Sequence, residues 1–131
     1  MIILGCGRVG AQLAYLLDRD GHTVTIIDQD VEAFRRLRPG FRGTIVAGDG
    51  LDEDLLIRVG IETADAFIAL TDGDNHNIMA SQMAKHVHSV PIVISQIKDP
   101  LRGEVYEALG VESVSPTILG ADRIREMMGS S

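Results

Sequence analysis

Three features that restrict where a protein works are scarce or missing in this sequence: cysteine, long hydrophobic runs and positive charge. The one cysteine, Cys6, has no partner for an internal disulfide. No apolar run approaches the ~18 to 20 residues that a membrane-spanning helix requires. The apolar start, residues 1–4, stops at Gly5 with no basic segment before it, so it does not resemble a signal peptide. We therefore expect a cytoplasmic protein without direct membrane insertion.

The shortage of positive charge limits the partners of the chain. Lys and Arg number 12 against 19 Asp and Glu, which gives a net charge of -7 and a pI near 4.9. Nucleic acid and anionic lipid bind clustered Lys and Arg, which release the counterions of the phosphates. We therefore expect no nucleic-acid partner.

Short apolar runs alternate with longer segments along the whole chain of 131 residues. The runs are residues 1–4, 23–27, 44–47, 66–70, 91–94 and 111–114. They do not alternate strictly with polar residues, which is typical of strands that helices bury on both faces. Helical spacing of apolar residues, or helical character, is present over residues 9–17, 77–87, 101–109 and 117–128. The pattern predicts one α/β domain: a Rossmann-like, doubly wound, six-stranded parallel sheet with helices on both faces.

A glycine motif joins the first predicted strand to the first predicted helix. It is the segment Gly5-Cys6-Gly7-Arg8-Val9-Gly10, of the form G-x-G-x-x-G. In this position Gly5 permits a tight turn, Gly7 lets a phosphate approach the backbone, and Gly10 lets helix and strand pack closely. The helix N-terminus then faces the anion. The motif predicts a nucleotide site, with a ligand-free glycine turn as the alternative.

An acidic residue ends the second predicted strand. Asp28 lies 18 residues after Gly10, close to the ~20-residue spacing of the carboxylate that binds a ribose. Such a carboxylate would repel a 2'-phosphate, and the adjacent Gln29-Asp30 adds no positive charge, so the pattern disfavours NADP. The alternative is that Asp28 only caps the next helix.

Two further loops follow predicted strands and are expected at the same edge of the sheet. They are Gly48-Asp49-Gly50 and residues 71–77. The second has the start of a calcium-loop spacing but lacks the glycine and the final glutamate of an EF-hand, so we expect no metal site there. Its alternative role is a helix N-cap through Asp74 or Asn75.

No catalytic group is predicted. The four histidines do not converge in the sequence, and we expect them on the solvated surface. Cys6 has no adjacent histidine, which favours a small packed residue over a nucleophile.

Together these stretches resemble a known family, the N-terminal lobe of regulator-of-potassium-conductance (RCK) domains, also called the KTN or TrkA-N domain. The resemblance covers essentially the whole chain. The matching stretches are residues 2–10, Val24-Thr25-Ile26-Ile27-Asp28, Gly48-Asp49-Gly50, Ala69-Leu70-Thr71 through Asp74 to Asn77, Gly110-Val111-Glu112 and Ser115-Pro116.

The resemblance implies a cytoplasmic regulatory domain that binds NAD(H), ATP, ADP or AMP. Such a domain passes the nucleotide state to a potassium channel or transporter at the inner face of the membrane, through a dimer or a larger ring. Many relatives carry an Ala-Arg pair after the fifth strand, whereas this chain has Ser95-Gln96. Because a neutral amide cannot replace that charge, we expect an adenine nucleotide without fixing its number of phosphates. The expected binding residues are Gly5, Cys6, Gly7, Arg8, Val9, Gly10, Asp28, Gln29, Gly48, Asp49, Gly50, Leu70, Thr71, Asp74, Asn77 and Gln96.

Two other functions remain open. One is the cofactor domain of an NAD-dependent oxidoreductase. The sequence argues against it, because neither Tyr15 nor Tyr106 is followed four residues later by the Lys of the Tyr-x-x-x-Lys pair of short-chain dehydrogenases. The other is the regulatory domain of a cation/proton antiporter, which can use the same lobe.

The resemblance also implies self-association and a longer parent protein. We expect a homodimer through residues 77–87 and 101–109, with Met79, Met83 and Tyr106 as candidate interface residues. The domain is expected to span residues 1–128, with 129–131 as a tail, and a second lobe is expected beyond it.

Overall fold

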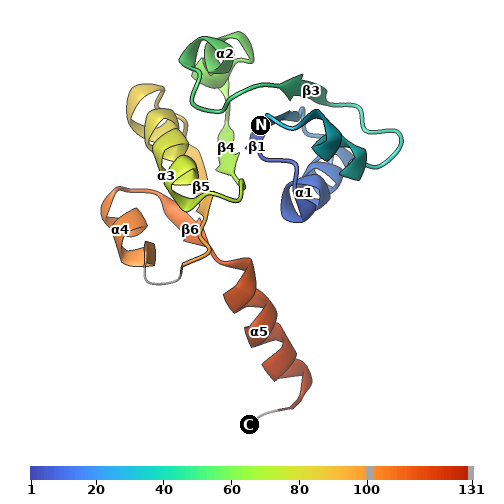
Figure 1. The fold of residues 1–131 in the computed structure, drawn as a ribbon, viewed down its shortest axis with the longest axis vertical. Helices are drawn as coiled ribbons and strands as arrows, with labels where there is room; N and C mark the ends of the chain where they lie inside the picture. Colours follow the sequence, from blue (N-terminus) through green and yellow to red (C-terminus); the bar gives the residue numbers. More distant parts are fainter. Residues whose placement is uncertain (100–101, 130–131) are drawn as a thin grey trace.

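A six-stranded parallel sheet forms the centre of the molecule. The computed structural model describes residues 1–99 and 102–129 (Figure 1). The strands are β1 (Ile2–Leu4), β2 (Thr25–Asp28), β3 (Thr44–Ala47), β4 (Ala66–Ala69), β5 (Ile92–Gln96) and β6 (Glu112–Val114). Their order is β3-β2-β1-β4-β5-β6, and every neighbouring pair is parallel. The predicted fold class is therefore confirmed.

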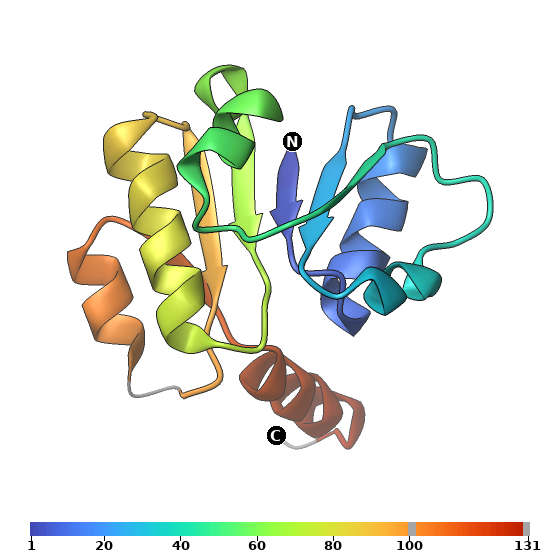
Figure 2. The same cartoon turned by 45° about the horizontal axis from the view of Figure 1, so that its top comes forward.

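Helical segments cover the sheet from both sides (Figure 2). They are α1 (Arg8–Arg19), η1 (Val31–Arg36), α2 (Glu53–Arg58), η2 (Ile61–Thr63), α3 (Asp74–Gln82), η3 (Met83–Val87), α4 (Gly103–Ala108) and α5 (Pro116–Met127). Ile3 of β1 packs with Ala14 of α1 on one face, while Ile2 and Leu4 pack with Ala80 of α3 on the other. Because successive side chains of a strand point to opposite faces, burial on both faces explains the unbroken apolar runs.

The edge strand β3 departs from this expectation. Only the short 3-10 helix η1 lies between β2 and β3, and Thr44, Ile45 and Ala47 are exposed, Ile45 to 49%. A 3-10 helix of 6 residues is too short to cover the outer strand, so burial on both faces fails there.

The two helices expected at the dimer interface also differ from the prediction. Residues 77–87 are not one helix: α3 begins at Asp74, and its last turn is the π-helix η3. Residue 101, at the start of the second segment, lies outside the described residues.

Tyr106 of α4 is only 1% exposed and its hydroxyl donates to the Asp74 carbonyl at 2.8 Å. Burial raises the pKa of this phenol. Tyr106 is therefore a core residue, and its assignment to an interface was wrong.

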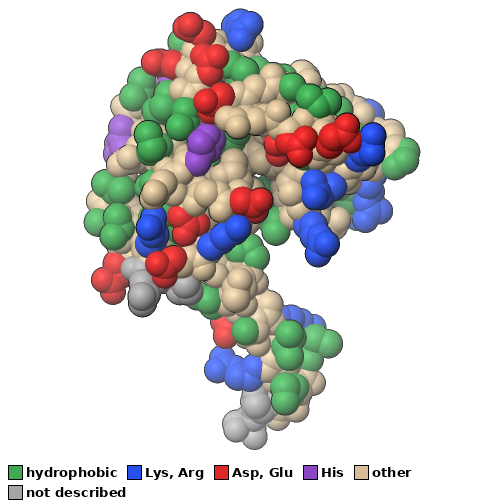
Figure 3. All heavy atoms as spheres, in the orientation of Figure 1, with side chains coloured by type: hydrophobic (Ala, Val, Ile, Leu, Met, Phe, Trp, Pro, Cys, Tyr) green, Lys and Arg blue, Asp and Glu red, His purple; other side chains and the backbone are tan. Residues whose placement is uncertain are grey.

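The last helix, α5, projects away from the sheet (Figure 1). None of its residues is buried, and hydrophobic side chains are visible on it (Figure 3), Ile124 and Met127 being 60% and 71% exposed. No helix in the described part of the chain is long and apolar enough to span a membrane.

Candidate functional site

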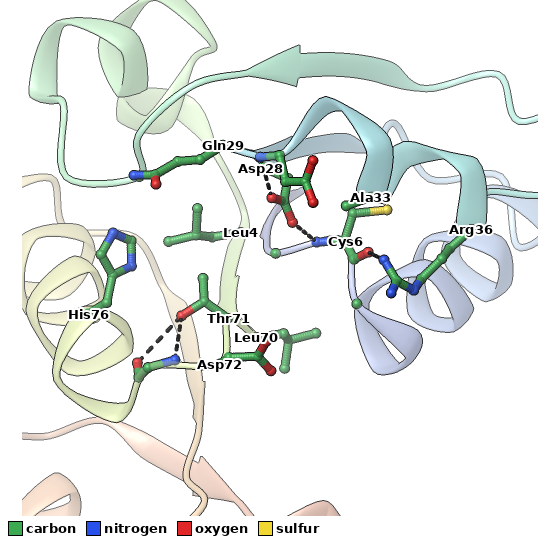
Figure 4. Close-up of a pocket in the computed structure, with 15 residues that line it drawn as sticks. Leu4, Cys6, Asp28, Gln29, Ala33, Arg36, Leu70, Thr71, Asp72 and His76 are labelled. Atoms are coloured by element: carbon green, nitrogen blue, oxygen red, sulfur yellow. Dashed lines mark hydrogen bonds between the residues drawn. The ribbon is translucent and has the colours of Figure 1, made fainter.

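A hollow of about 370 Å³ lies beyond the carboxyl ends of β1, β2 and β4 (Figure 4). In an open parallel sheet, ligands bind where neighbouring connections leave in opposite directions. That point falls between β1, which leads through α1 to β2, and β4, which leads through α3 to β5. The lining residues are Leu4, Gly5, Cys6, Gly7, Asp28, Gln29, Asp30, Ala33, Arg36, Gly50, Leu70, Thr71, Asp72, Gly73 and His76. Its volume lies within the ~300 to 1,000 Å³ of small-molecule sites.

Gly5, Cys6 and Gly7 of the glycine motif line the hollow, and at Gly5 and Gly10 the backbone is packed too closely for a side chain. Gly5 has φ +105°, and a Cβ there would lie 2.7 Å from the Leu70 carbonyl oxygen. A Cβ on Gly10 would overlap the carbonyl oxygen of Gly5. Helix α1 begins at Arg8, and its N-cap, Gly7, makes no side-chain capping bond. The first N–H groups of α1 are therefore left for an anion.

Asp28 ties the glycine loop to the end of β2. Its Oδ2 accepts from the Cys6 N–H at 2.7 Å, and its Oδ1 accepts from the Asp30 N–H at 2.8 Å. The helix-cap alternative is wrong, because the N-cap of η1 is Asp30, whose side chain accepts from the Glu32 N–H. Each carboxylate oxygen of Asp28 keeps a second lone pair, which can accept from a ribose hydroxyl.

His76 lines the hollow and contacts a distant segment through Asp49, a predicted binding residue that does not itself line the hollow. His76 Nε2 of α3 lies 3.2 Å from Asp49 Oδ1, and Asp49 also accepts from the Leu51 N–H at 2.9 Å. The Leu51 N–H, followed by His76 and Gln29, holds the pKa of Asp49 below its ordinary value. His76 is half-buried, and the His88 side chain is only 6% exposed. The expectation of four solvated histidines was therefore wrong for these two.

Cys6 is buried within the glycine loop. Burial raises the pKa of its thiol, the Asp28 carboxylate raises it further, and Arg36 opposes them. A thiol with a raised pKa is a poor nucleophile, because the thiolate is the reactive form. Among the described residues no group of three or more His, Cys, Asp or Glu side chains is arranged to hold a metal ion.

Asp74 and Asn77 do not line the hollow, although both were predicted as binding residues. Asp74 accepts from the Lys98 and Asp99 N–H groups at 2.8 and 3.1 Å, so it holds the segment after β5. It is not the N-cap of α3, which is Gly73, and Asn75 instead accepts from Arg102. The N-cap assignment of Asp74 was therefore wrong, and its predicted contact with a nucleotide stays a prediction.

Asn77 does not line the hollow but holds the backbone of Thr71, which does. It is fully buried; its Oδ1 accepts from the Thr71 N–H at 3.0 Å, and its Nδ2 donates to the carbonyls of Thr71 and Gln96 at 3.0 and 3.2 Å. Its hydrogen-bonding groups are thus used by the backbone, which fixes Thr71 at the end of β4. Thr71 itself lines the hollow.

A second hollow, also of about 370 Å³, adjoins the first on the far side of the glycine loop. It shares Gly7, Arg36, Leu70 and Asp72 with the first and adds Arg8, Val9, Gln96, Ile97, Lys98, Pro116 and Thr117. Arg8, Val9 and Gln96 therefore lie at this second hollow. Gly10 lies beneath the loop, and Gly48 packs against Leu55, so neither lines a hollow.

Sequence reasoning missed several side chains that line the first hollow, above all Arg36 and His76. Arg36 belongs to η1, and its Nη1 lies 3.5 Å from the Cys6 carbonyl oxygen. The only sequence signal was proximity: both residues follow a strand whose carboxyl end meets the glycine loop.

Comparison with known proteins gives a consistent set of relatives. The profile of the TrkA-N domain matches residues 1–116. The Trk system potassium uptake protein TrkA of Streptomyces coelicolor is 46% identical over 124 residues, which are 95% of this chain and 56% of that protein. The chain thus spans about half the length of the relative.

Solved structures share the fold. The GsuK structure bound to ADP superposes with a TM-score of 0.78 at 26% identity, over 94% of this chain and 32% of that one. The TrkA-N domain of the inner membrane protein ybaL from Escherichia coli gives a TM-score of 0.84 at 17% identity, over 96% and 93% of the two chains.

Proposed function

Because the chain belongs to the TrkA-N domain family, we propose that it binds an adenine nucleotide and thereby regulates potassium transport by a membrane channel or transporter. The relative with 46% identity is a potassium uptake protein, and a solved relative, GsuK, is bound to ADP. The observation that carries the proposal is the first hollow, where the uncapped N-terminus of α1 and the carboxylate of Asp28 face one cavity. A helix N-terminus suits a phosphate, and a carboxylate suits the ribose hydroxyls.

The charges of the hollow restrict the nucleotide. Asp28, Asp30 and Asp72 line it beside one cation among the described residues, Arg36, and carboxylates beside the ribose repel a 2'-phosphate. The ligand is therefore NAD(H), ATP, ADP or AMP rather than NADP. The second hollow is large enough to extend the site for a dinucleotide, with Gln96 in place of a cation.

We propose no catalytic step for this domain. The Cys6 thiol is buried with a raised pKa, so it is not an activated nucleophile. The pore partner is a potassium channel or transporter, with a cation/proton antiporter as the alternative partner of the same lobe. In either case the domain acts at the cytoplasmic face of the membrane.

Ligand binding is tested by titrating NAD, NADH, ATP, ADP and AMP calorimetrically, with NADP as the matched control. A ligand at about 100 times its dissociation constant should raise the free energy of unfolding by about 2.7 kcal/mol, a shift of several degrees in Tm. NADP should bind more weakly than NAD because of the Asp28 carboxylate. Failure of all five ligands to bind at millimolar concentration would contradict the proposal.

Self-association is a further part of the proposal. Met79 of α3, Val87 of η3, Ile92 of β5 and Val105 of α4 are 50% to 61% exposed, and their elements lie on the β6 side of the sheet (Figure 1). Met83 is half-buried against the core and contributes less than expected. We expect a homodimer that buries about 1,200 to 2,000 Å². Sedimentation across protein concentration measures it, and a monomer at high micromolar concentration would count against it.

A further inference from the structure

One cation has a special place at the two hollows. Among the described residues, Arg36 is the only Lys or Arg that lines the first hollow, and it also lines the second. Its guanidinium lies on the η1 side of the glycine loop, with Nη1 at 3.5 Å from the Cys6 carbonyl oxygen (Figure 4). That contact is at the outer limit of a hydrogen bond, so most donors of the fork remain for another acceptor.

The carboxylates that line the first hollow explain why a cation there favours the binding of a phosphate. Three carboxylates, those of Asp28, Asp30 and Asp72, line the first hollow in a protein of net charge -7. A phosphate that enters this hollow meets an unfavourable field, which the N-terminus of α1 offsets by only about half a charge. A full positive charge at the loop therefore strengthens the binding of an anion beyond what the helix N-terminus supplies.

Nearby basic side chains are less suited to this role. Lys98 Nζ lies 3.4 Å from Asp72 Oδ1, and Arg35 Nε lies 2.8 Å from Glu32 Oε2, so both are paired with carboxylates. Arg8 lines only the second hollow. Arg36 forms no ion pair with a carboxylate within the described part of the chain. Its fork can therefore face a phosphate, to which guanidinium groups bind through two parallel hydrogen bonds.

We propose that Arg36 contacts the phosphate nearest the ribose and makes this site selective for nucleotides over nucleosides. The inference rests on the proposed function and adds a residue that the glycine motif does not contain. Its consequence is that the affinity gained from the first phosphate depends on η1, a segment outside the loop and helix of the motif.

The test compares Arg36→Gln with Arg35→Gln, a neighbour that removes the same charge from the same segment. Adenosine, AMP and ADP are titrated against both variants and the unchanged chain, adenosine at millimolar concentration by NMR. With Arg36→Gln we expect AMP and ADP to bind about 10-fold more weakly or worse, because a charge-assisted contact is lost. Adenosine should change less than about 2-fold, and Arg35→Gln should leave all three affinities nearly unchanged.

A second variant, Arg36→Lys, separates loss of the charge from a disturbance of the glycine loop. Arg36→Lys keeps the charge without the fork, so AMP binding should fall less than with Arg36→Gln. Equal losses for adenosine and AMP in Arg36→Gln would overturn the inference, since Arg36 would then act on the base or on the loop. An equal loss in Arg35→Gln would also overturn it. If the unchanged chain binds none of the five nucleotides NAD, NADH, ATP, ADP and AMP, the proposed function fails and this inference with it, an outcome distinct from failure of the variants alone.

Discussion

Gly10→Ala should lower the free energy of unfolding by about 3 kcal/mol, at the upper end of the cost of overpacking. The added Cβ would overlap the carbonyl oxygen of Gly5. That oxygen cannot move freely, because the N–H of its own peptide, that of Cys6, donates to Asp28 Oδ2 at 2.7 Å and the preceding N–H, that of Gly5, donates to the Ile27 carbonyl at 2.7 Å. The clash therefore separates α1 from β1. Urea unfolding followed by circular dichroism at 222 nm measures the loss, since the chain has no tryptophan.

Two other glycines provide matched controls for this substitution. Gly120 lies inside α5, and a Cβ added there would meet nothing within 4 Å, so Gly120→Ala should be neutral or stabilise by about 1 kcal/mol. Gly7 also has open space at its Cβ position. Gly7→Ala should therefore preserve the fold and weaken nucleotide binding, because the methyl group occupies the approach to the helix N-terminus. Equal stability of Gly10→Ala and Gly120→Ala would contradict the packing argument.

Asp28→Ala should weaken every adenine nucleotide tenfold or more and also lower the free energy of unfolding by about 1 to 3 kcal/mol. The first effect follows from the loss of the ribose acceptor. The second follows from the structure, where the carboxylate accepts from the N–H groups of Cys6 and Asp30. Calorimetric titration of folded protein and urea unfolding measure the two effects separately.

Asp30→Ala is the control for Asp28→Ala. Asp30 lines the same hollow, but its side chain accepts from the Glu32 N–H as the N-cap of η1. Its loss should cost about 1 kcal/mol of stability and leave nucleotide affinity within a few-fold. A folded Asp28→Ala variant with unchanged affinity would mean that Asp28 only holds the glycine loop.

Much of the fold was predictable because its determinants are local. The six strands lie where short apolar runs stand between segments with helical spacing, and α1 begins inside the glycine motif. The position of Asp28 beside the glycine loop was predictable for the same reason, since Asp28 ends a strand that pairs with β1. Parallel pairing brings such strand ends to one edge of the sheet. Apolar patterning and turn residues act over a few positions, so one sequence suffices to recognise them.

The direction in which each polar side chain points was decided by tertiary structure. Asp74 and Asn77 occupy a loop at the correct edge of the sheet, yet both face backbone groups of neighbouring strands and loops. Buried backbone groups must be paired, and the nearest side chain with the required donors or acceptors pairs with them before any ligand does. That competition depends on contacts between segments far apart in the chain, which spacing along the sequence does not encode.

The sequence by itself thus determined the sheet, its glycine loop and the acidic end of β2. Only the tertiary structure decided that Arg36 and His76 line the hollow, that Tyr106 is buried and that β3 is left half uncovered. The physical reason is the range of the interactions. Strand and helix propensities are local, whereas burial and charge at a site are set by packing among elements that the chain brings together from distant positions.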